Sequence, residues 1–202
     1  MSKAEPPPLT FRIVEPQEVA QVKQEVKEAF FSGDDATIDA HFQEHENGVS
    51  TTILGYEAGR LVGVVTIRWQ LHYPPFREQQ IPLIQNIEIQ YEDRGRGLGN
   101  QMLERTEQEI AWRSALTGLV VGISREHGAA QRLYAKRSYV PDGRGVFRGH
   151  TPLELGEVVT VDHDLLLWLV KDVSHLSEGT GTNTVTTPLR KRKGLLVSRT
   201  TQ

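Results

Sequence analysis

The residues best suited to chemistry form a glycine-rich turn between an apolar strand pattern and a helical pattern. The segment Tyr91–Asn100 reads Tyr-Glu-Asp-Arg-Gly-Arg-Gly-Leu-Gly-Asn and follows the apolar residues 81–89. Glycine lets an anion approach the backbone, and unpaired N–H groups at a helix start carry partial positive charge. Arg94 and Arg96 can add charge-assisted hydrogen bonds. The turn is therefore predicted to bind a phosphate group.

The spacing of the glycines in the turn distinguishes between several phosphate-binding motifs. A Walker turn needs Gly-Lys-Ser or Gly-Lys-Thr, but Gly99 is followed by Asn100. A dinucleotide site needs Gly-x-Gly-x-x-Gly, whereas this run is Gly-x-Gly-x-Gly. What remains is Arg94-x-x-Gly97-x-Gly99, for which an ordinary glycine-rich helix start is the alternative. This pattern resembles the acyl-CoA pyrophosphate loop of the GNAT superfamily of N-acyltransferases.

Hydrophobic periodicity predicts the elements around this turn. The order is a strand, two helices, three strands, a helix, a strand, a helix and a final β region within 158–171. An irregular insert at 70–80 precedes the strand that leads into the turn. This order predicts a mixed α/β sandwich in which helices cover a central sheet.

A second motif strengthens the resemblance. GNAT proteins typically carry Asn-x-x-Ala-x-x-Leu-Tyr followed by Gly-Phe or Gly-Tyr. Here the corresponding run is His127-Gly-Ala-Ala-Gln-Arg-Leu-Tyr134, then Ser138-Tyr139, so His replaces Asn and Ser replaces Gly. The resemblance covers 11–171 by element order and is specific from 87 to 139. It implies a mostly antiparallel central sheet flanked by helices, with a splayed strand pair that holds acyl-CoA.

The resemblance also implies an activity and its residues. Acetyl-CoA would be the co-substrate, with no metal, and the acetyl group would pass directly to an amine in a ternary complex. Tyr134 is implied as the general acid for the leaving thiolate, with a core aromatic role as the alternative. A backbone N–H of 87–90, that of Ile89, would polarise the thioester carbonyl. The predicted acyl-CoA-binding residues are Ile87, Ile89, Gln90, Arg94, Gly95, Arg96, Gly97, Leu98, Gly99, Asn100, His127 and Ala130.

The general base is predicted from strand alternation. Alternation places Asn86, Glu88 and Gln90 on one face and the two isoleucines of 87–89 on the other. A carboxylate between isoleucines near the acetyl group could accept the amine proton, so Glu88 is the candidate base. The alternative is that Glu88 is a solvated or structurally bonded strand residue.

Acceptor recognition is assigned to the insert and the strand before it. The predicted substrate-binding residues are Trp69, Tyr73, Phe76 and Arg77, because aromatic side chains on a proline-stiffened loop suit a pocket wall. Equally, the prolines at 74 and 75 could anchor the loop with the two insert aromatics packed inward. Trp112 and Trp168 are assigned to core or partly buried packing, and Asp162-His163-Asp164 to a strand start rather than a metal site.

Composition limits the remaining possibilities. The 202 residues carry a formal net charge of −3 and no cysteine, which excludes disulfides and thiolate chemistry and fits a cytoplasmic protein. The N-terminus lacks the apolar core of a signal peptide, and no apolar run is long enough to span a membrane. The predicted regions are an arm at 1–9, an acetyltransferase domain at 10–173 and a flexible basic tail at 174–202.

The basic residues of the tail leave the body acidic, so binding to nucleic acid is not expected. The predicted partner is a small-molecule or peptide amine, and a homodimer is possible. The competing class is a catalytically silent protein that binds acyl-CoA on the same fold.

Overall fold

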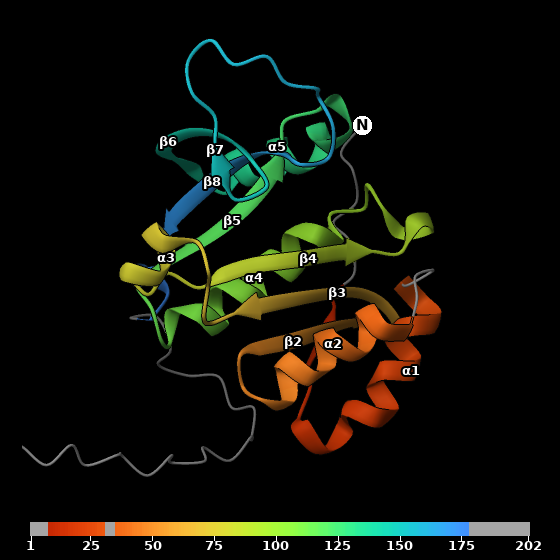
Figure 1. The fold of residues 1–202 in the computed structure, drawn as a ribbon. Helices are drawn as coiled ribbons and strands as arrows, with labels where there is room; N and C mark the ends of the chain where they lie inside the picture. Colours follow the sequence, from red (N-terminus) through yellow and green to blue (C-terminus); the bar gives the residue numbers. More distant parts are fainter. Residues whose placement is uncertain (1–7, 31–34, 178–202) are drawn as a thin grey trace, which may run out of the picture.

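A computed structural model describes residues 8–30 and 35–177 of the chain (Figure 1). The described elements are β1 (Thr10–Ile13), η1 (Pro16–Glu18), α1 (Val19–Phe30), α2 (Asp35–Glu46), β2 (Ser50–Glu57), β3 (Arg60–Arg68), α3 (Pro74–Glu78), β4 (Leu83–Ile89), η2 (Tyr91–Asp93), α4 (Leu98–Ala111), β5 (Leu116–Gly122), η3 (Arg125–His127), α5 (Gly128–Lys136), β6 (Val140–Arg148), β7 (Thr151–Pro152), β8 (Leu165–Asp172) and η4 (Ser174–Leu176). Here η marks short 3-10 helices.

The strands form one sheet in the order β1-β2-β3-β4-β5-β8-β6-β7. All neighbouring strands run antiparallel except β4 and β5, which run parallel. The parallel pair joins only at Leu83 with Gly118 and Ile84 with Leu119. Beyond these residues the two strands diverge, as Figure 1 shows. The predicted fold class, with its splayed strand pair, is therefore confirmed.

Helices cover both faces of the sheet. The helices α1 and α2 pack on one face, where Val22, Val26 and Phe42 meet Leu54 and Val64 of β2 and β3. On the opposite face, α4 buries the residues predicted to share one side of this helix, Leu98, Met102, Thr106 and Ile110. The helix α5 adds its apolar side chains to the same cluster. The amphipathic helices therefore sit where burial of their apolar stripes is most favourable.

The insert contains a helix that the sequence pattern did not predict. Tyr73 and Phe76, at the start of α3 and within it, are 3% and 1% exposed and pack against Trp168. The Tyr73 ring stacks on the Trp168 ring at 4.0 Å, and the Tyr73 hydroxyl donates to Asp142 Oδ2 at 2.7 Å. Of the two alternatives for these aromatics, inward packing holds.

The prediction for Trp112 is wrong, since its side chain is 64% exposed just beyond the last turn of α4.

The described body extends past both predicted boundaries. Leu9, assigned to the arm, is buried, and its N–H donates to Gln101 Oε1 at 2.9 Å. At the other end Val173 is buried and Leu176 of η4 packs against the α4 side of the core. The predicted tail from residue 178 onward lies outside the described residues, so its flexibility stays a prediction.

A buried ion cluster ties three elements on the α4 side of the sheet. Glu107 of α4 is fully buried and accepts hydrogen bonds from Arg137 Nη2 at 2.6 Å and Lys171 Nζ at 2.7 Å. Burial opposes the charge of Glu107, but the hydrogen bonds from these two cations outweigh it and lower the carboxyl pKa. Arg137 Nη1 also donates to Asn100 Oδ1 at 2.9 Å, which links the cluster to the first turn of α4.

Glu107→Gln should lower the free energy of unfolding by about 3 kcal/mol, because it leaves two largely buried cations uncompensated. The matched control is Glu109→Gln, which breaks only the Arg105–Glu109 pair of one helix and should cost less than about 0.5 kcal/mol. Urea denaturation of both variants measures the difference. Because the Glu107 pKa is lowered on folding, its contribution exists above the unfolded pKa and should vanish as the pH falls. Equal losses for the two variants would contradict this role of the cluster.

Candidate active site

The glycine-rich turn forms a cradle of unpaired backbone donors. Gly95 and Gly97 adopt left-handed conformations with φ values of 76° and 86°, and Gly97 is the N-cap of α4. The first N–H to bond back to the turn is that of Asn100, which donates to Gly97 O at 3.1 Å. In the described part of the chain, the five N–H groups of Gly95–Gly99 find no acceptor. Such a row at a helix start suits a diphosphate.

The two arginines of the turn differ in their partners. Arg96 donates from Nη1 to Glu57 Oε2 at 3.0 Å and to Asp93 Oδ1 at 2.5 Å, so its charge is already compensated. Arg94 is exposed, its Nε donates to Ile89 O at 3.0 Å, and its guanidinium lies 5.5 Å from the centre of the Tyr91 ring, so its two Nη groups have no hydrogen-bond partner among the described residues. We therefore propose that Arg96 holds the turn on the β2–β3 hairpin, whereas Arg94 meets the phosphate.

Arg94→Ala should weaken CoA binding about tenfold, since charge-assisted hydrogen bonds of this kind contribute roughly 1.5–3 kcal/mol. Calorimetric titration with CoA measures the effect. The loss should shrink as salt is added, because part of it is screened charge. Arg105→Ala, at a half-buried ion pair further along α4, is the control and should bind CoA like the parent protein. Unchanged affinity for the Arg94 variant would remove Arg94 from the site.

A bulge in β4 lies beside the point where the strands diverge. On β3 Val64 and Thr66 lie two positions apart, while their partners on β4, Glu88 and Gln85, lie three positions apart. The extra residue is accommodated at Asn86, which has a φ of 52°. The predicted uninterrupted alternation is therefore wrong at Asn86. The bulge places Gln85 on the same face as Glu88, the face that α2 covers.

The bulge leaves the end of β4 with free backbone groups toward β5. Gln90 N–H donates to Val62 O at 3.0 Å, which makes Gly63 and Ile89 a non-hydrogen-bonded pair. The N–H of Ile89 therefore points away from β3, toward the gap that β5 leaves. This orientation is the one that the predicted contact of Ile89 with a thioester carbonyl requires.

Glu88 lies at this gap without a partner. It is half-buried, and its carboxylate forms no hydrogen bond or ion pair with a residue in the described ranges. Burial raises its pKa, and the charge of Arg94 only partly opposes this shift. A half-buried, unpaired carboxylate with a raised pKa is a suitable proton acceptor at neutral pH.

Tyr134 reaches the same region from α5. It packs against the same core cluster as Ile89, and its hydroxyl has no hydrogen bond to any residue that the structure describes. Burial raises the pKa of this phenol, so it stays protonated at neutral pH and can donate. The nearby Gly99 links the elements, since a Cβ there would lie 3.6 Å from Leu133 of α5 and 3.9 Å from Ile89 of β4. The structure thus brings the turn, β4 and α5 together.

His127 occupies the place where GNAT proteins usually carry Asn. Its ring lies against the end of β5, where a Cβ on Gly122 would approach it to 2.4 Å. The ring nitrogen Nδ1 lies 3.0 Å from Ser124 Oγ, which leaves Nε2 available to a ligand. Ala130, one turn into α5, is half-buried against the core.

A comparison with protein families matches residues 19–139 to the acetyltransferase (GNAT) family. The chain belongs to the GNAT family. The matched region contains both sequence motifs and every element from α1 to α5. No curated protein matches the sequence.

Solved structures share this GNAT fold. A chimera that includes the spermidine N-acetyltransferase SpeG from Vibrio cholerae superposes with a TM-score of 0.57 and 15% identity, covering 84% of this chain and 98% of its own. RimL, a ribosomal alpha-N-protein acetyltransferase in complex with coenzyme A, has a TM-score of 0.57 and 13% identity over 85% and 98%. An N-acetyltransferase from Staphylococcus aureus gives 0.57 and 16% over 82% and 98%. At these identities the likeness establishes the fold alone.

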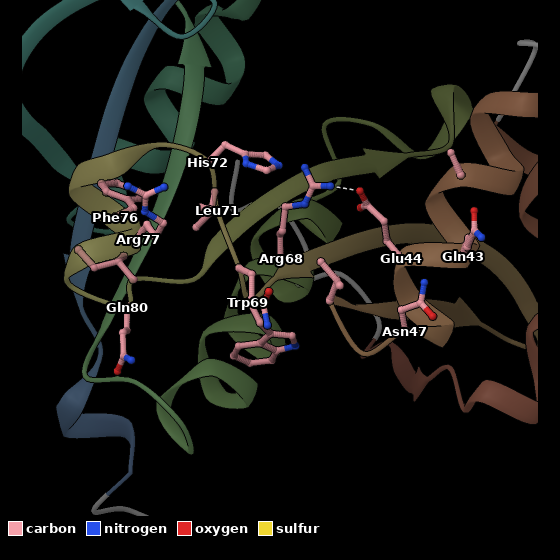
Figure 2. A pocket seen from close by; sticks show the side chains of 14 residues that line it. Gln43, Glu44, Asn47, Arg68, Trp69, Leu71, His72, Phe76, Arg77 and Gln80 are labelled. Atoms are coloured by element: carbon pink, nitrogen blue, oxygen red, sulfur yellow. Dashed lines mark hydrogen bonds and ion pairs between the residues drawn. The ribbon is translucent and has the colours of Figure 1, made fainter.

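A pocket of about 820 Å³ lies between α2 and α3 of this GNAT domain, at the end of β3 (Figure 2). Three of the four predicted substrate-binding residues, Trp69, Phe76 and Arg77, line it, whereas Tyr73 does not. The sequence analysis missed the opposite wall, to which α2 contributes Glu44 among others. No spacing rule connects a helix residue with a strand more than twenty positions away, so nothing in the sequence pointed to this wall.

Two further findings concern the described ranges 8–30 and 35–177. They contain no group of three or more His, Cys, Asp or Glu side chains that could hold a metal ion. No helix there has the length and apolar character needed to cross a membrane.

The acidic segment Asp162-His163-Asp164 forms the turn just before β8, which begins at Leu165.

Proposed function

We propose that the protein transfers the acetyl group of acetyl-CoA to a primary amine of a small molecule or peptide, by direct attack in a ternary complex. One observation carries the proposal above the others: an unpaired carboxylate with a raised pKa, that of Glu88, lies on β4 one residue before the outward-pointing N–H of Ile89. A proton acceptor beside an oxyanion donor is what amine acylation requires.

Each group has a role in this proposal. The amides of Gly95–Gly99 and the Arg94 guanidinium hold the diphosphate of acetyl-CoA at the start of α4. The free backbone of 87–90 pairs with the pantetheine arm as another strand would. The N–H of Ile89 stabilises negative charge on the thioester oxygen, Glu88 takes the proton of the attacking amine, and the Tyr134 hydroxyl donates a proton to the departing sulfur.

Unpaired backbone groups of this chain support CoA as its ligand. The unpaired amide row needs an anionic ligand, and the free edge of β4 needs a partner with amide groups of its own. CoA offers both groups. RimL, a fold neighbour, has been solved in complex with coenzyme A, which supports the assignment.

The proposal is tested by release of free CoA thiol from acetyl-CoA in the presence of single amines. Spermidine and a peptide with a free N-terminus are the first acceptors to use, because fold neighbours are named as acetyltransferases for spermidine and for a protein α-amine. We expect amine-dependent thiol release. CoA binding without release across a broad amine panel would instead identify a silent acyl-CoA-binding protein.

A further inference from the structure

The pocket between α2 and α3 has a charge distribution that sets a preference among acceptors. Its single acid, Glu44 of α2, pairs with Arg68 of β3 across the pocket, as the dashed line in Figure 2 shows. Arg77 of α3 is exposed and, within the described ranges, has neither a hydrogen-bond nor an ion-pair partner for its guanidinium. The Arg68 Nε is buried without an acceptor, so Glu44 does not saturate that guanidinium either. The pocket therefore favours an anion and disfavours a polycation.

The position of the pocket sets the length of the acceptor. Arg68 and Glu88 face the same side of the sheet, because Val64, the partner of Glu88, lies four residues from Arg68 on β3. Four strand residues span about 13 Å. On β3 the residue between these points, Thr66, is buried, but its partner Gln85 on the same face of β4 is half-exposed, so solvent reaches the β4 side of the strip that joins them. An acceptor with its amine at Glu88 must be extended to reach the pocket.

The uncharged lining indicates what the extended part consists of. Four side-chain amides line the pocket, one from α2, one from the turn just after it and two from the connection around α3, namely Gln43, Asn47, Gln70 and Gln80. A side-chain amide both donates and accepts hydrogen bonds. This property matches a peptide backbone, which offers alternating N–H and C=O groups, better than the alkyl chain of a polyamine.

We infer that the acceptor is the N-terminal amine of an extended peptide, with an acidic side chain at about the fourth residue held by Arg77 in the pocket between α2 and α3. This inference rests on the proposed function and narrows it. The distance of about 13 Å leads from Glu88 to Arg68, which lines this pocket together with Arg77, and it corresponds to roughly four extended residues. Polyamines would be poor acceptors by the same argument.

The test compares C-terminally amidated tetrapeptides by kcat/KM for thiol release from acetyl-CoA. Ser-Ala-Ala-Glu should exceed Ser-Ala-Ala-Gln about tenfold, as expected for one charge-assisted hydrogen bond, and Ser-Ala-Ala-Lys should be poorer still. Moving the acid to the second residue should abolish the advantage. With the parent protein, the ratio of kcat/KM for the Glu peptide to that for the Gln peptide should also fall as salt is added, so this measurement requires no substitution in the protein.

Substitutions of Arg77 test whether this residue causes the preference for the Glu peptide. Arg77→Gln should remove the preference for the Glu peptide, and Arg77→Glu should turn it toward the Lys peptide. The control Arg12→Gln, at an ion pair with Glu18 on β1, should keep the preference of the parent protein. Equal rates for the Glu and Gln peptides, a faster reaction with spermidine, or a preference that persists in Arg77→Gln would overturn the inference while leaving acetyl transfer intact. Failure of every amine to release thiol would overturn the proposed function, and this inference with it.

Discussion

Tyr134→Phe should lower kcat by about 10²–10⁴-fold while CoA affinity stays unchanged, because general acid catalysis typically contributes this much. The substitution keeps the ring, which packs against the core, and removes only a hydroxyl that bonds to no described residue. Without that hydroxyl the thiolate leaves unprotonated. Steady-state kinetics and calorimetric titration with CoA together separate the chemical step from binding.

Tyr139→Phe is the matched control for this prediction. Its ring lies 6.0 Å from that of Tyr134 in an edge-to-face contact, and its side chain is buried. Tyr139→Phe likewise removes one hydroxyl group, but Tyr139 lies beyond the end of α5 and away from the gap between β4 and β5. Its kcat should therefore stay within about threefold of the parent value, a small fraction of the acid-catalysis effect. Full turnover in Tyr134→Phe, or equal losses in both variants, would show that Tyr134 is not the acid.

Glu88→Gln should produce the second large loss, again about 10²–10⁴-fold in kcat, because the amide keeps the shape of the side chain but cannot accept the amine proton. The loss depends on pH. Burial raises the Glu88 pKa, so the parent protein loses its base as the pH falls through that raised pKa. At high pH the free amine no longer needs a base. The ratio of parent to variant should therefore be largest between the Glu88 pKa and the pKa of the amine.

A pH–rate profile measures this window, with Glu92→Gln as the control. Glu92 lies in η2 beside the turn and is well exposed, so its removal should leave the profile unchanged. If Glu88→Gln keeps the acidic limb of the parent profile, the amine proton must leave to water or to another group.

The parts of the site that could be predicted from sequence are those that local rules determine. A run with glycine at positions 95, 97 and 99 after an apolar strand leaves few conformations other than a tight turn into a helix, and two of these glycines have positive φ. The buried face of α4 follows from residues at helical spacing. These features depend on neighbours within one or two turns, so the sequence contains the information directly.

The parts that could not be predicted depend on contacts between distant residues. The pairing of Arg96 with Glu57 spans 39 positions, and no local pattern distinguishes it from a phosphate contact. Asn86 occupies a bulge that changes which side chains share a face with Glu88, although Asn is among the residues that tolerate positive φ. Burial of the insert aromatics against Trp168 depends likewise on a strand that follows some ninety positions later.

The central claim is that an acetyl group passes from acetyl-CoA directly to an amine at the gap between β4 and β5. Mass spectrometry after a single turnover with isotope-labelled acetyl-CoA and a tetrapeptide acceptor tests it most directly. The account predicts label on the N-terminal amine of the peptide, an equal amount of free CoA, and no label on the protein. Label retained on the protein, or bound acetyl-CoA that stays intact with every amine supplied, would contradict it.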